Sequence, residues 1–385
     1  MGNSEELPSG LRSLNHFISV VGLSLCLFLC QNKHIFTSPA SSIMRISKIY
    51  VYPVKSLRAT ELDSATLTKH GFTYDRHYMI LKVLEDGSYQ NMAVASFSEM
   101  TLFFTSIAIP EDGDALKGTV TITYRPPKGE QKTLDIPLKP KVDGLEAMDV
   151  IMHRSPTKAH KMNREYNDWL SSCFGFDVVL AYLGDNLRNV LMSTSGNKQE
   201  ASNGWFSSIT SKASQLVVGA SNEQSQITFA DCAPYLIVSE KSMDDVHSRL
   251  PEGQRMDITK FRPNIVVSGA EEVWEEDFWG ELTIGGETKV VCEHNCARCK
   301  SINIDYATGL PGTTEAGSIL KKLNSNRRVD PGAKWSPIFG RYSFLHPGSE
   351  GHTINLGDEV LVSKRNAERT RFGLFSLEDT LLVRG

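Results

Sequence analysis

Residues 45–54 read RISKIYVYPV, and comparable short runs of β-branched and aromatic residues follow along the chain. Turn formers such as Gly87 separate these runs. Short strand-like runs at this spacing predict an all-β barrel or sandwich rather than a βαβ array. The other runs are HYMILKV (77–83), LFFTSIAI (102–109), GTVTITYRP (118–126), FRPNIVVSG (261–269), DFWGELTIGG (277–286), TKVVCEH (288–294) and HTINLGDEVLVSK (352–364).

Two helices interrupt the predicted strands. In residues 161–175 (KMNREYNDWLSSCFG) apolar residues recur at helical spacing, and Gly175 stands where a helix ends. A second helix is expected after residues 233–240 (APYLIVSE). Ser239 is its predicted cap, with Asp244 and Asp245 in its first turn.

The composition is that of a globular chain. With 385 residues, 40% hydrophobic and 22% charged, the chain can bury a full core and form two or three lobes. Its formal net charge of -4 provides no broad basic surface, so no nucleic-acid partner is expected.

An apolar run lies near the N-terminus. Residues 17–30 (FISVVGLSLCLFLC) are shorter than the roughly 20 apolar residues that span a bilayer. Three interpretations stay open: a membrane anchor, a cleaved targeting segment, or an extension without a structural role.

The seven cysteines are unevenly spaced and odd in number, which favours reduced thiols in a compartment that faces the cytosol. Three of them crowd into CEHNCARC, residues 292–299, together with His294. This cluster allows a zinc site, buried cysteines without a metal, or a single thiolate on a transition metal that also takes sulfur from an organic ligand. Arg298 would favour the thiolate form of Cys299.

Five phrases in order carry a resemblance to a known family. The chain resembles the MOSC-domain proteins, in particular the mitochondrial amidoxime-reducing components, from about residue 45 to about residue 364. The phrases are YPVKSL (52–57), YDRHYMIL (74–81), FRPNIVVSG (261–269), CARCKSINIDYATG (296–309) and SPIFGRY (336–342).

The resemblance implies a mainly β fold with α+β elements. It places an N-terminal MOSC-type β-barrel lobe at residues 44–183 and a MOSC β-barrel domain at 184–365. Residues 1–43 are then an N-terminal extension, and residues 366–385 a C-terminal tail.

The resemblance also implies a binding site for molybdenum cofactor. Cys299 matches the thiolate that ligates molybdenum beside the dithiolene of the pterin, so it is the expected catalytic residue. Arginine suits phosphate because its planar, charged group donates two parallel hydrogen bonds. Contacts with the pterin or its phosphate, by side chain or backbone, are expected from Lys55, Ser56, Arg76, Cys232, Ala233, Arg262, Asn264, Ala297, Arg298 and Tyr342.

Two segments depart from the family pattern. Cys232 and Ala233 stand in DCAPYLIVSE (231–240), where relatives often carry small hydroxyl residues, so contacts there would come mainly from the backbone. The segment MAVASFSEM (92–100) lacks an Arg-Gln pair of close relatives, which leaves one side of the cleft in doubt.

The activity implied by the resemblance is reduction of amidoximes and related N-hydroxylated compounds. We expect no intrinsic haem, flavin or iron-sulfur cluster, because the chain has no second cysteine set and no Gly-rich dinucleotide motif after a strand. Electrons would come from a cytochrome b5-type protein and its NADH-dependent reductase. The implied location is the mitochondrial outer membrane facing the cytosol, or otherwise the cytoplasm.

Two other functions stay open. The chain could be a cofactor-binding or sulfur-carrier MOSC module without reductase activity, or a binding protein that has lost its metal. Asp231 and Asp305 are general-base candidates only by residue type, and structural carboxylates are the alternative.

Overall fold

The computed structural model describes residues 1–2, 43–110, 113–190 and 225–372. The chain divides at Ile43, and the described strands and helices all lie in the unit Ile43–Gly385. Strands dominate this unit, which confirms the prediction of a mainly β fold. The predicted anchor, residues 17–30, lies outside the described residues, among which no helix is long and apolar enough to span a bilayer.

An eight-stranded sheet organises the C-terminal half together with the first strands. The backbone N–H of Ile46 donates to the Asp358 carbonyl at 2.9 Å, and that of Val360 to the Met44 carbonyl at 2.9 Å. These bonds join one end of the sheet to the other, as in a partly closed barrel. The strand order is β2 (Thr60–Leu62), β1 (Arg45–Val51), β16 (Ile265–Ser268), β15 (Tyr235–Ser239), β21 (Ile338–Leu345), β18 (Thr288–Ala297), β17 (Trp279–Ile284) and β23 (Val360–Arg365).

This sheet is buried on both faces. Successive side chains of a strand point to opposite faces, so Ile237 and Ile265 pack into one core while Leu236 and Val266 pack into another. The second core lies against α3 (Glu240–Ser248) and α4 (Ile319–Asn324).

The helix α3 connects β15 to β16, which run parallel. The Ser239 hydroxyl accepts from the Lys241 N–H at 3.1 Å, so the predicted cap is confirmed. The placement of Asp244 and Asp245 in the first turn was wrong, because the helix begins at Glu240 and only that acid lies there. Asp245 instead pairs with Arg249 at 2.6 Å, one turn further along.

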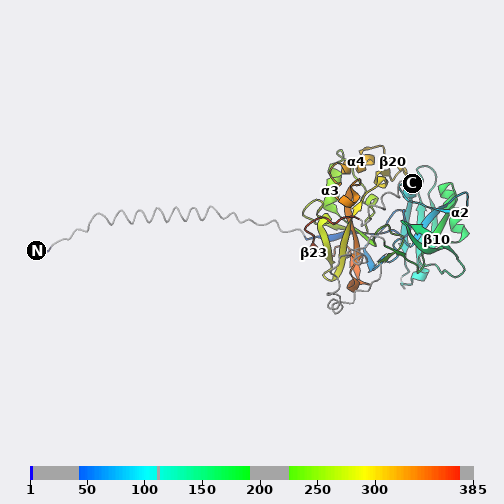
Figure 1. The fold of residues 1–385 in the computed structure, drawn as a ribbon, viewed down its shortest axis with the longest axis horizontal. Helices are drawn as coiled ribbons and strands as arrows, with labels where there is room; N and C mark the ends of the chain where they lie inside the picture. Colours follow the sequence, from blue (N-terminus) through cyan, green and yellow to red (C-terminus); the bar gives the residue numbers. More distant parts are fainter. Residues whose placement is uncertain (3–42, 111–112, 191–224, 373–385) are drawn as a thin grey trace, which may run out of the picture. The chain divides into compact units, whose positions relative to one another are not determined.

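A five-stranded sheet organises the N-terminal half, and α2 (Arg164–Phe174) packs on it. Gly175 ends this helix with φ 78°, as predicted. Figure 1 draws α2 and β10 on the opposite side of this unit from β23. The strand order is β10 (Glu146–Met152), β11 (Ser155–Lys161), β12 (Val178–Tyr182), β5 (Tyr78–Val83) and β6 (Tyr89–Asn91).

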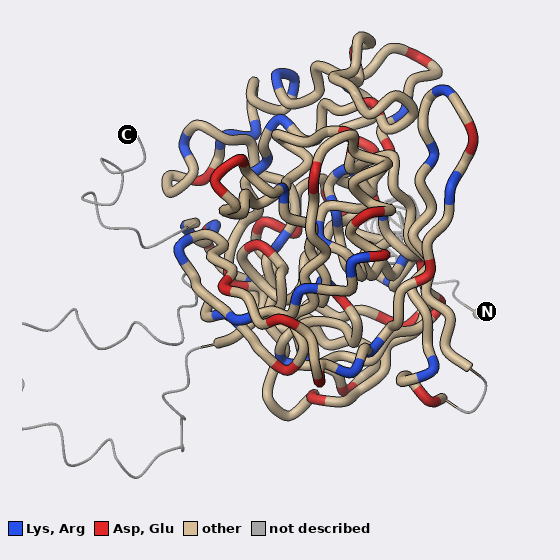
Figure 2. Tube along the Cα trace, turned by 90° about the vertical axis from the view of Figure 1, so that its right-hand side faces the viewer, with Lys and Arg blue, Asp and Glu red and all other residues tan. Residues whose placement is uncertain are grey.

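Smaller sheets and turns complete the unit. They are β7 (Phe103–Ala108), β8 (Thr119–Tyr124) and β9 (Lys132–Pro137); β22 (Thr353–Asn355), β3 (Ser64–Thr68) and β4 (Gly71–Phe72); β13 (Arg188–Asn189) and β14 (Gln226–Ile227); and β19 (Ile304–Asp305) and β20 (Leu310–Pro311). Short 3-10 turns are η1 (Ser98–Leu102), η2 (Ala115–Lys117), η4 (Ile258–Phe261), η5 (Glu275–Phe278), η6 (Lys300–Asn303), η7 (Glu315–Ser318), η8 (Pro331–Ala333) and η9 (Pro347–Ser349). Basic and acidic residues intermingle along the described trace (Figure 2).

Candidate functional site

One pocket brings together most of the residues that the sequence singled out. Its lining comes from the turn after β4, the loop before β15, the end of η4, the end of β18 with η6, and β21. Among the predicted residues, those that line it are Arg76, Ala233, Arg262, Asn264, Ala297, Arg298, Cys299 and Tyr342. Lys55, Ser56 and Cys232 are not among its lining residues.

Cys299 presents its sulfur at this pocket. β18 ends at Ala297 after a register shift, and the Arg298 N–H bonds the Pro337 carbonyl at 2.9 Å. The chain then turns into η6, which Cys299 precedes as its N-cap residue. The Cys299 side chain is exposed, and its Sγ lies 3.2 Å from the Ser301 hydroxyl. A sulfur so placed is accessible to a ligand in the pocket.

The other cysteines of CEHNCARC are buried in different cores. Cys292 belongs to the core within the barrel and receives a hydrogen bond from Ser343 at 3.4 Å, whereas Cys296 belongs to the core against α3 and α4. Burial raises the pKa of both thiols. Within the described ranges, no three His, Cys, Asp or Glu side chains gather closely enough to hold a metal ion, so the zinc interpretation loses its ligand set.

Arg76 and Arg262 enclose one aromatic ring. Their guanidinium carbons lie 4.6 and 4.2 Å from the centre of the Tyr52 ring. Both arginines have left-handed backbone, with φ 57° and 55°. Arg76 is paired with the buried Asp75, whereas Arg262 Nη1 donates to the Leu57 carbonyl at 2.8 Å. Arg262 therefore keeps donors for a ligand.

Arg298 is held by backbone carbonyls. Its Nε donates to the Phe339 carbonyl at 2.8 Å and its Nη1 to the Phe261 carbonyl at 2.7 Å. Gly340, with φ 87°, allows this approach, because a Cβ there would lie 3.3 Å from Arg298 Nη2 and 2.9 Å from the Ile237 carbonyl. No carboxylate of the described chain lies within ion-pair distance of Arg298, so its positive charge adds to the potential of the pocket.

Asp231 is the acidic residue of the pocket lining. The Lys55 ammonium donates to its Oδ1, and His153 Nε2 lies 3.2 Å from the same atom. Burial opposes ionisation of Asp231, but Lys55 and His153 outweigh it and hold the pKa of this carboxyl well below its ordinary value. Lys55 thus acts on the pocket through Asp231. Arg188, which sequence reasoning missed, is buried and donates to the Asp231 carbonyl at 2.6 Å.

Several predicted residues have structural partners. The Asn264 side chain accepts from the Leu236 N–H at 3.2 Å and donates to the Tyr50 carbonyl at 3.2 Å. Ser56 donates to the Met92 carbonyl at 3.3 Å. The Tyr342 hydroxyl is hydrogen-bonded to the thiols of Cys232 and Cys296. Burial raises the pKa of Tyr342 well above its ordinary value. These contacts shape the walls of the pocket.

Sequence reasoning missed other lining residues. Lys260 precedes FRPN in a turn that Asp257 caps, and Ser301 follows CARC. The sequence signal that could have identified them is their position next to the FRPN and CARC phrases. Asp305 is not among the lining residues and accepts from the Ala307 N–H at 3.0 Å, which fits the structural alternative.

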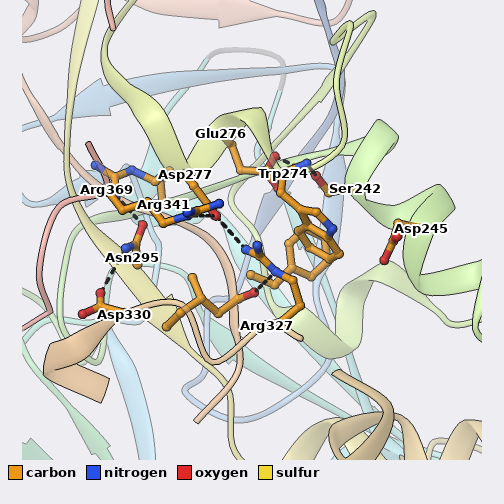
Figure 3. A network of polar contacts seen from close by, with 12 residues as sticks. Ser242, Asp245, Trp274, Glu276, Asp277, Asn295, Arg327, Asp330, Arg341 and Arg369 are labelled. Carbon is orange, nitrogen blue, oxygen red and sulfur yellow. Dashed lines mark hydrogen bonds and ion pairs between the residues drawn. The ribbon is translucent and has the colours of Figure 1, made fainter. Parts of the chain in front are cut away.

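A second arginine cluster, the buried network, includes Asn295 on β18 and Arg341 on β21, which adjoin the pocket residues Cys296 and Tyr342 in sequence (Figure 3). Both oxygens of the fully buried Asp277 accept from Arg327 Nη2, at 2.8 and 2.9 Å, and Arg369 Nε donates at 2.7 Å. Arg341 donates to Asn295 Oδ1 at 2.5 Å and to the Thr370 hydroxyl at 2.6 Å. The network consists of Asp277, Asn295, Arg327, Asp330, Arg341 and Arg369, the last from the predicted tail.

Comparison with known proteins identifies two domains. Residues 43–177 match the MOSC N-terminal beta barrel domain, and residues 224–361 match the MOSC domain. This order agrees with the predicted two-lobed architecture, while the boundaries set at residues 43, 183 and 365 stay predictions.

Several named proteins match the chain over most of its length. The chain is 27% identical to mitochondrial amidoxime-reducing component 1 of Mus musculus, over 82% of this chain and 81% of the relative. It is 28% identical to mitochondrial amidoxime reducing component 2 of Bos taurus, over 82% of each. A molybdenum cofactor sulfurase of Solanum lycopersicum is 26% identical over 82% of this chain but 35% of its own length. The chain therefore belongs to the MOSC-domain proteins, with a MOSC N-terminal β-barrel domain ahead of its MOSC domain.

Proposed function

We propose that this protein binds molybdenum cofactor in the pocket, with Cys299 as the metal ligand, and reduces N-hydroxylated small molecules. The observation that carries the proposal is the exposed Cys299 thiol in a pocket that Arg262 and Arg298 also line, neither with a carboxylate partner among the described residues. The names of the relatives add support.

The donor set fits this group chemically. A single accessible thiolate suits a soft metal that takes further sulfur from an organic ligand. Arg262 retains donors that can bind the pterin phosphate. Arg298, whose Nε is bonded to a backbone carbonyl, contributes positive charge to the pocket. Cys299 would hold the metal, and Tyr342, Ala297 and Ala233 would border the pterin.

The bound cofactor would supply the two-electron redox chemistry that breaks the N–O bond. For an amidoxime the balance is two electrons and two protons taken up, with the amidine and water released. Asp231 is the ionisable acid at the pocket and is held charged by Lys55 and His153. We propose that it hydrogen-bonds the polar end of the substrate and orients it.

We propose that the electrons come from a cytochrome b5-type protein and its NADH-dependent reductase. The exposed Cys299 and Lys300 place the proposed metal ligand near the surface, as a transient electron-transfer contact requires. A mitochondrial outer-membrane location facing the cytosol is also proposed, on the names of the relatives alone. Fractionation of cells that express the chain with and without residues 1–43 would test it.

The experiment uses full-length protein from a host that makes molybdenum cofactor. Molybdenum and pterin are quantified, and benzamidoxime reduction is measured with reduced methyl viologen as electron source. We expect stoichiometric molybdenum and turnover, both lost in Cys299→Ala but retained in the matched control Cys292→Ala, whose thiol is buried in another core. Equal activity in the two variants would reject the assignment of the ligand.

A cofactor-handling or sulfur-carrier module is the second candidate. It is favoured by the match to a molybdenum cofactor sulfurase, of which this chain spans about a third. Bound molybdenum without turnover of any N-hydroxylated compound would support this candidate over the reductase.

A further inference from the structure

A line of stacked cationic and aromatic side chains leads away from the pocket, and we call it the cation track. It begins at Lys260, whose Nζ lies 5.3 Å from the centre of the Tyr306 ring. The Arg58 guanidinium lies 4.0 Å from the same ring and 4.8 Å from that of Phe104. Arg125 covers Phe104 at 4.1 Å. Each aromatic ring of the track therefore contacts two cations.

Segments distant in sequence build the track. Lys260 belongs to η4, Tyr306 follows β19, and Phe104 lies on β7. Backbone bonds fix the far end, because the N–H of Arg58 donates to the Phe103 carbonyl and that of Arg125 to the Leu102 carbonyl, both at 2.9 Å. The track thus joins residues of both MOSC domains in a fixed geometry.

The charge of the track is only partly neutralised. Asp257 pairs with Arg58 at 2.9 Å. Lys260 and Arg125 have no carboxylate within 4.0 Å in the described part of the chain, and Arg125 bonds the neutral Gln131 at 3.1 Å. Lys260 is half-buried, and burial lowers the pKa of its ammonium although the more distant Asp257 and Asp305 raise it.

We infer that the cation track is a substrate subsite that selects planar N-hydroxylated compounds bearing a carboxylate or phosphate. This inference rests on the proposed function. An anionic group would supply the missing counter-charge, and a flat ring would stack on the guanidinium of the exposed Arg125. The pocket end would then receive the N–OH group beside Cys299.

Lys260 could instead bind the phosphate of the cofactor, and the test separates these roles. Holoenzyme is assayed with benzamidoxime and with 4-carboxybenzamidoxime, and pterin content is measured in every sample. In Lys260→Gln the ratio of kcat/KM for the carboxylated over the neutral substrate should fall about tenfold, which corresponds to about 1.4 kcal/mol. In Arg125→Gln it should fall about threefold, since exposed pairs are worth less.

The matched control is Arg164→Gln, which removes one positive charge from the exposed face of α2 outside the track. The control should leave the ratio unchanged, and pterin content should stay constant in all three variants. Loss of pterin in Lys260→Gln with an unchanged ratio would overturn the inference, as would equal ratios in all proteins.

Binding without turnover separates this inference from the proposed function. Equilibrium dialysis of the oxidised holoenzyme should show tighter binding of 4-carboxybenzamidoxime than of benzamidoxime, with the preference reduced in Lys260→Gln. That preference without reduction of either compound would contradict the reductase but support the track. Reduction of benzamidoxime by wild type, with no preference in binding or turnover, would contradict the track and leave the reductase in place.

Discussion

Arg327 and Arg262 illustrate two ways in which this fold uses arginine. In the buried network, Arg327 donates to both oxygens of Asp277, and Arg369 donates to the same carboxylate (Figure 3). At the pocket, Arg262 stacks on Tyr52 and bonds one carbonyl. A buried cation paired with a carboxylate has a structural role, because removing one partner leaves an uncompensated charge in the core. An arginine that keeps donors beside a pocket is available to an anionic ligand.

The largest expected effect comes from removing the acid of the buried network. Asp277→Ala leaves Arg327 without its ion pair in a dry site, so the free energy of unfolding should fall by about 3–5 kcal/mol. Urea denaturation measures this. Asp245→Ala, which breaks the more exposed pair with Arg249, should cost less than about 1 kcal/mol. Equal losses in the two variants would contradict the structural role of the network.

Glu276, a buried neighbour of Asp277 in the sequence, gives this part of the core a pH dependence. Burial raises the pKa of this carboxyl to about 8, although Ser242 donates to it at 2.7 Å. The folded state therefore binds a proton that the unfolded state has released, and stability should fall as pH rises from about 4.5 to 8. At about 1.4 kcal/mol for each pKa unit, the loss is up to about 5 kcal/mol.

Glu276→Gln should remove that pH dependence, because an amide does not titrate in this range. Unfolding free energies at pH 5 and pH 8 test the expectation, with Glu275→Gln as the control since Glu275 instead pairs with Arg365. A slope that persists in Glu276→Gln would show that another group carries it.

Arg262→Gln sharpens the contrast between the two regions. Losing a charge-assisted bond worth about 1.5–3 kcal/mol should lower pterin retention about 10- to 100-fold, while the unfolding free energy of the apo protein changes by less than about 1 kcal/mol. Arg327→Gln should instead lower the unfolding free energy of the apo protein and leave pterin retention unchanged. Pterin retention is measured by fluorescence of the oxidised pterin after dialysis, and stability is measured by urea denaturation. An equal loss of stability in both variants would contradict the difference between the two arginines.

The smallest effect concerns Asp231, whose side chain is about half exposed. Its depressed pKa means that its contribution is present above the unfolded value near pH 4 and is lost as pH falls through the lower folded value. Asp231→Asn should therefore cost about 1 kcal/mol at pH 7 and less at pH 3. The same cost at both pH values would exclude its ion pair with Lys55 as the source.

The sequence predicted the strands because short runs rich in β-branched, aromatic and other apolar residues are bounded by turn formers, as in β5 and β15, which are buried over most of their length. It singled out Cys299, Arg76 and Arg262 because they stand in short phrases. The links of Asp277 to Arg327 and of His153 to Asp231 could not be predicted, since they join residues 50 and 78 positions apart. Lys260 was missed although it directly precedes FRPN, because the resemblance assigned it no contact and its place in the pocket depends on the folded turn.

The central claim is that Cys299 ligates molybdenum in a pocket whose cations bind the pterin. Molybdenum K-edge X-ray absorption on the purified holoprotein tests it most directly, because this method counts sulfur neighbours of the metal. Because Cys299→Ala removes the proposed ligand, we expect one sulfur fewer per molybdenum, or no bound molybdenum, in this variant and an unchanged spectrum in Cys292→Ala. An unchanged sulfur count in Cys299→Ala would contradict it.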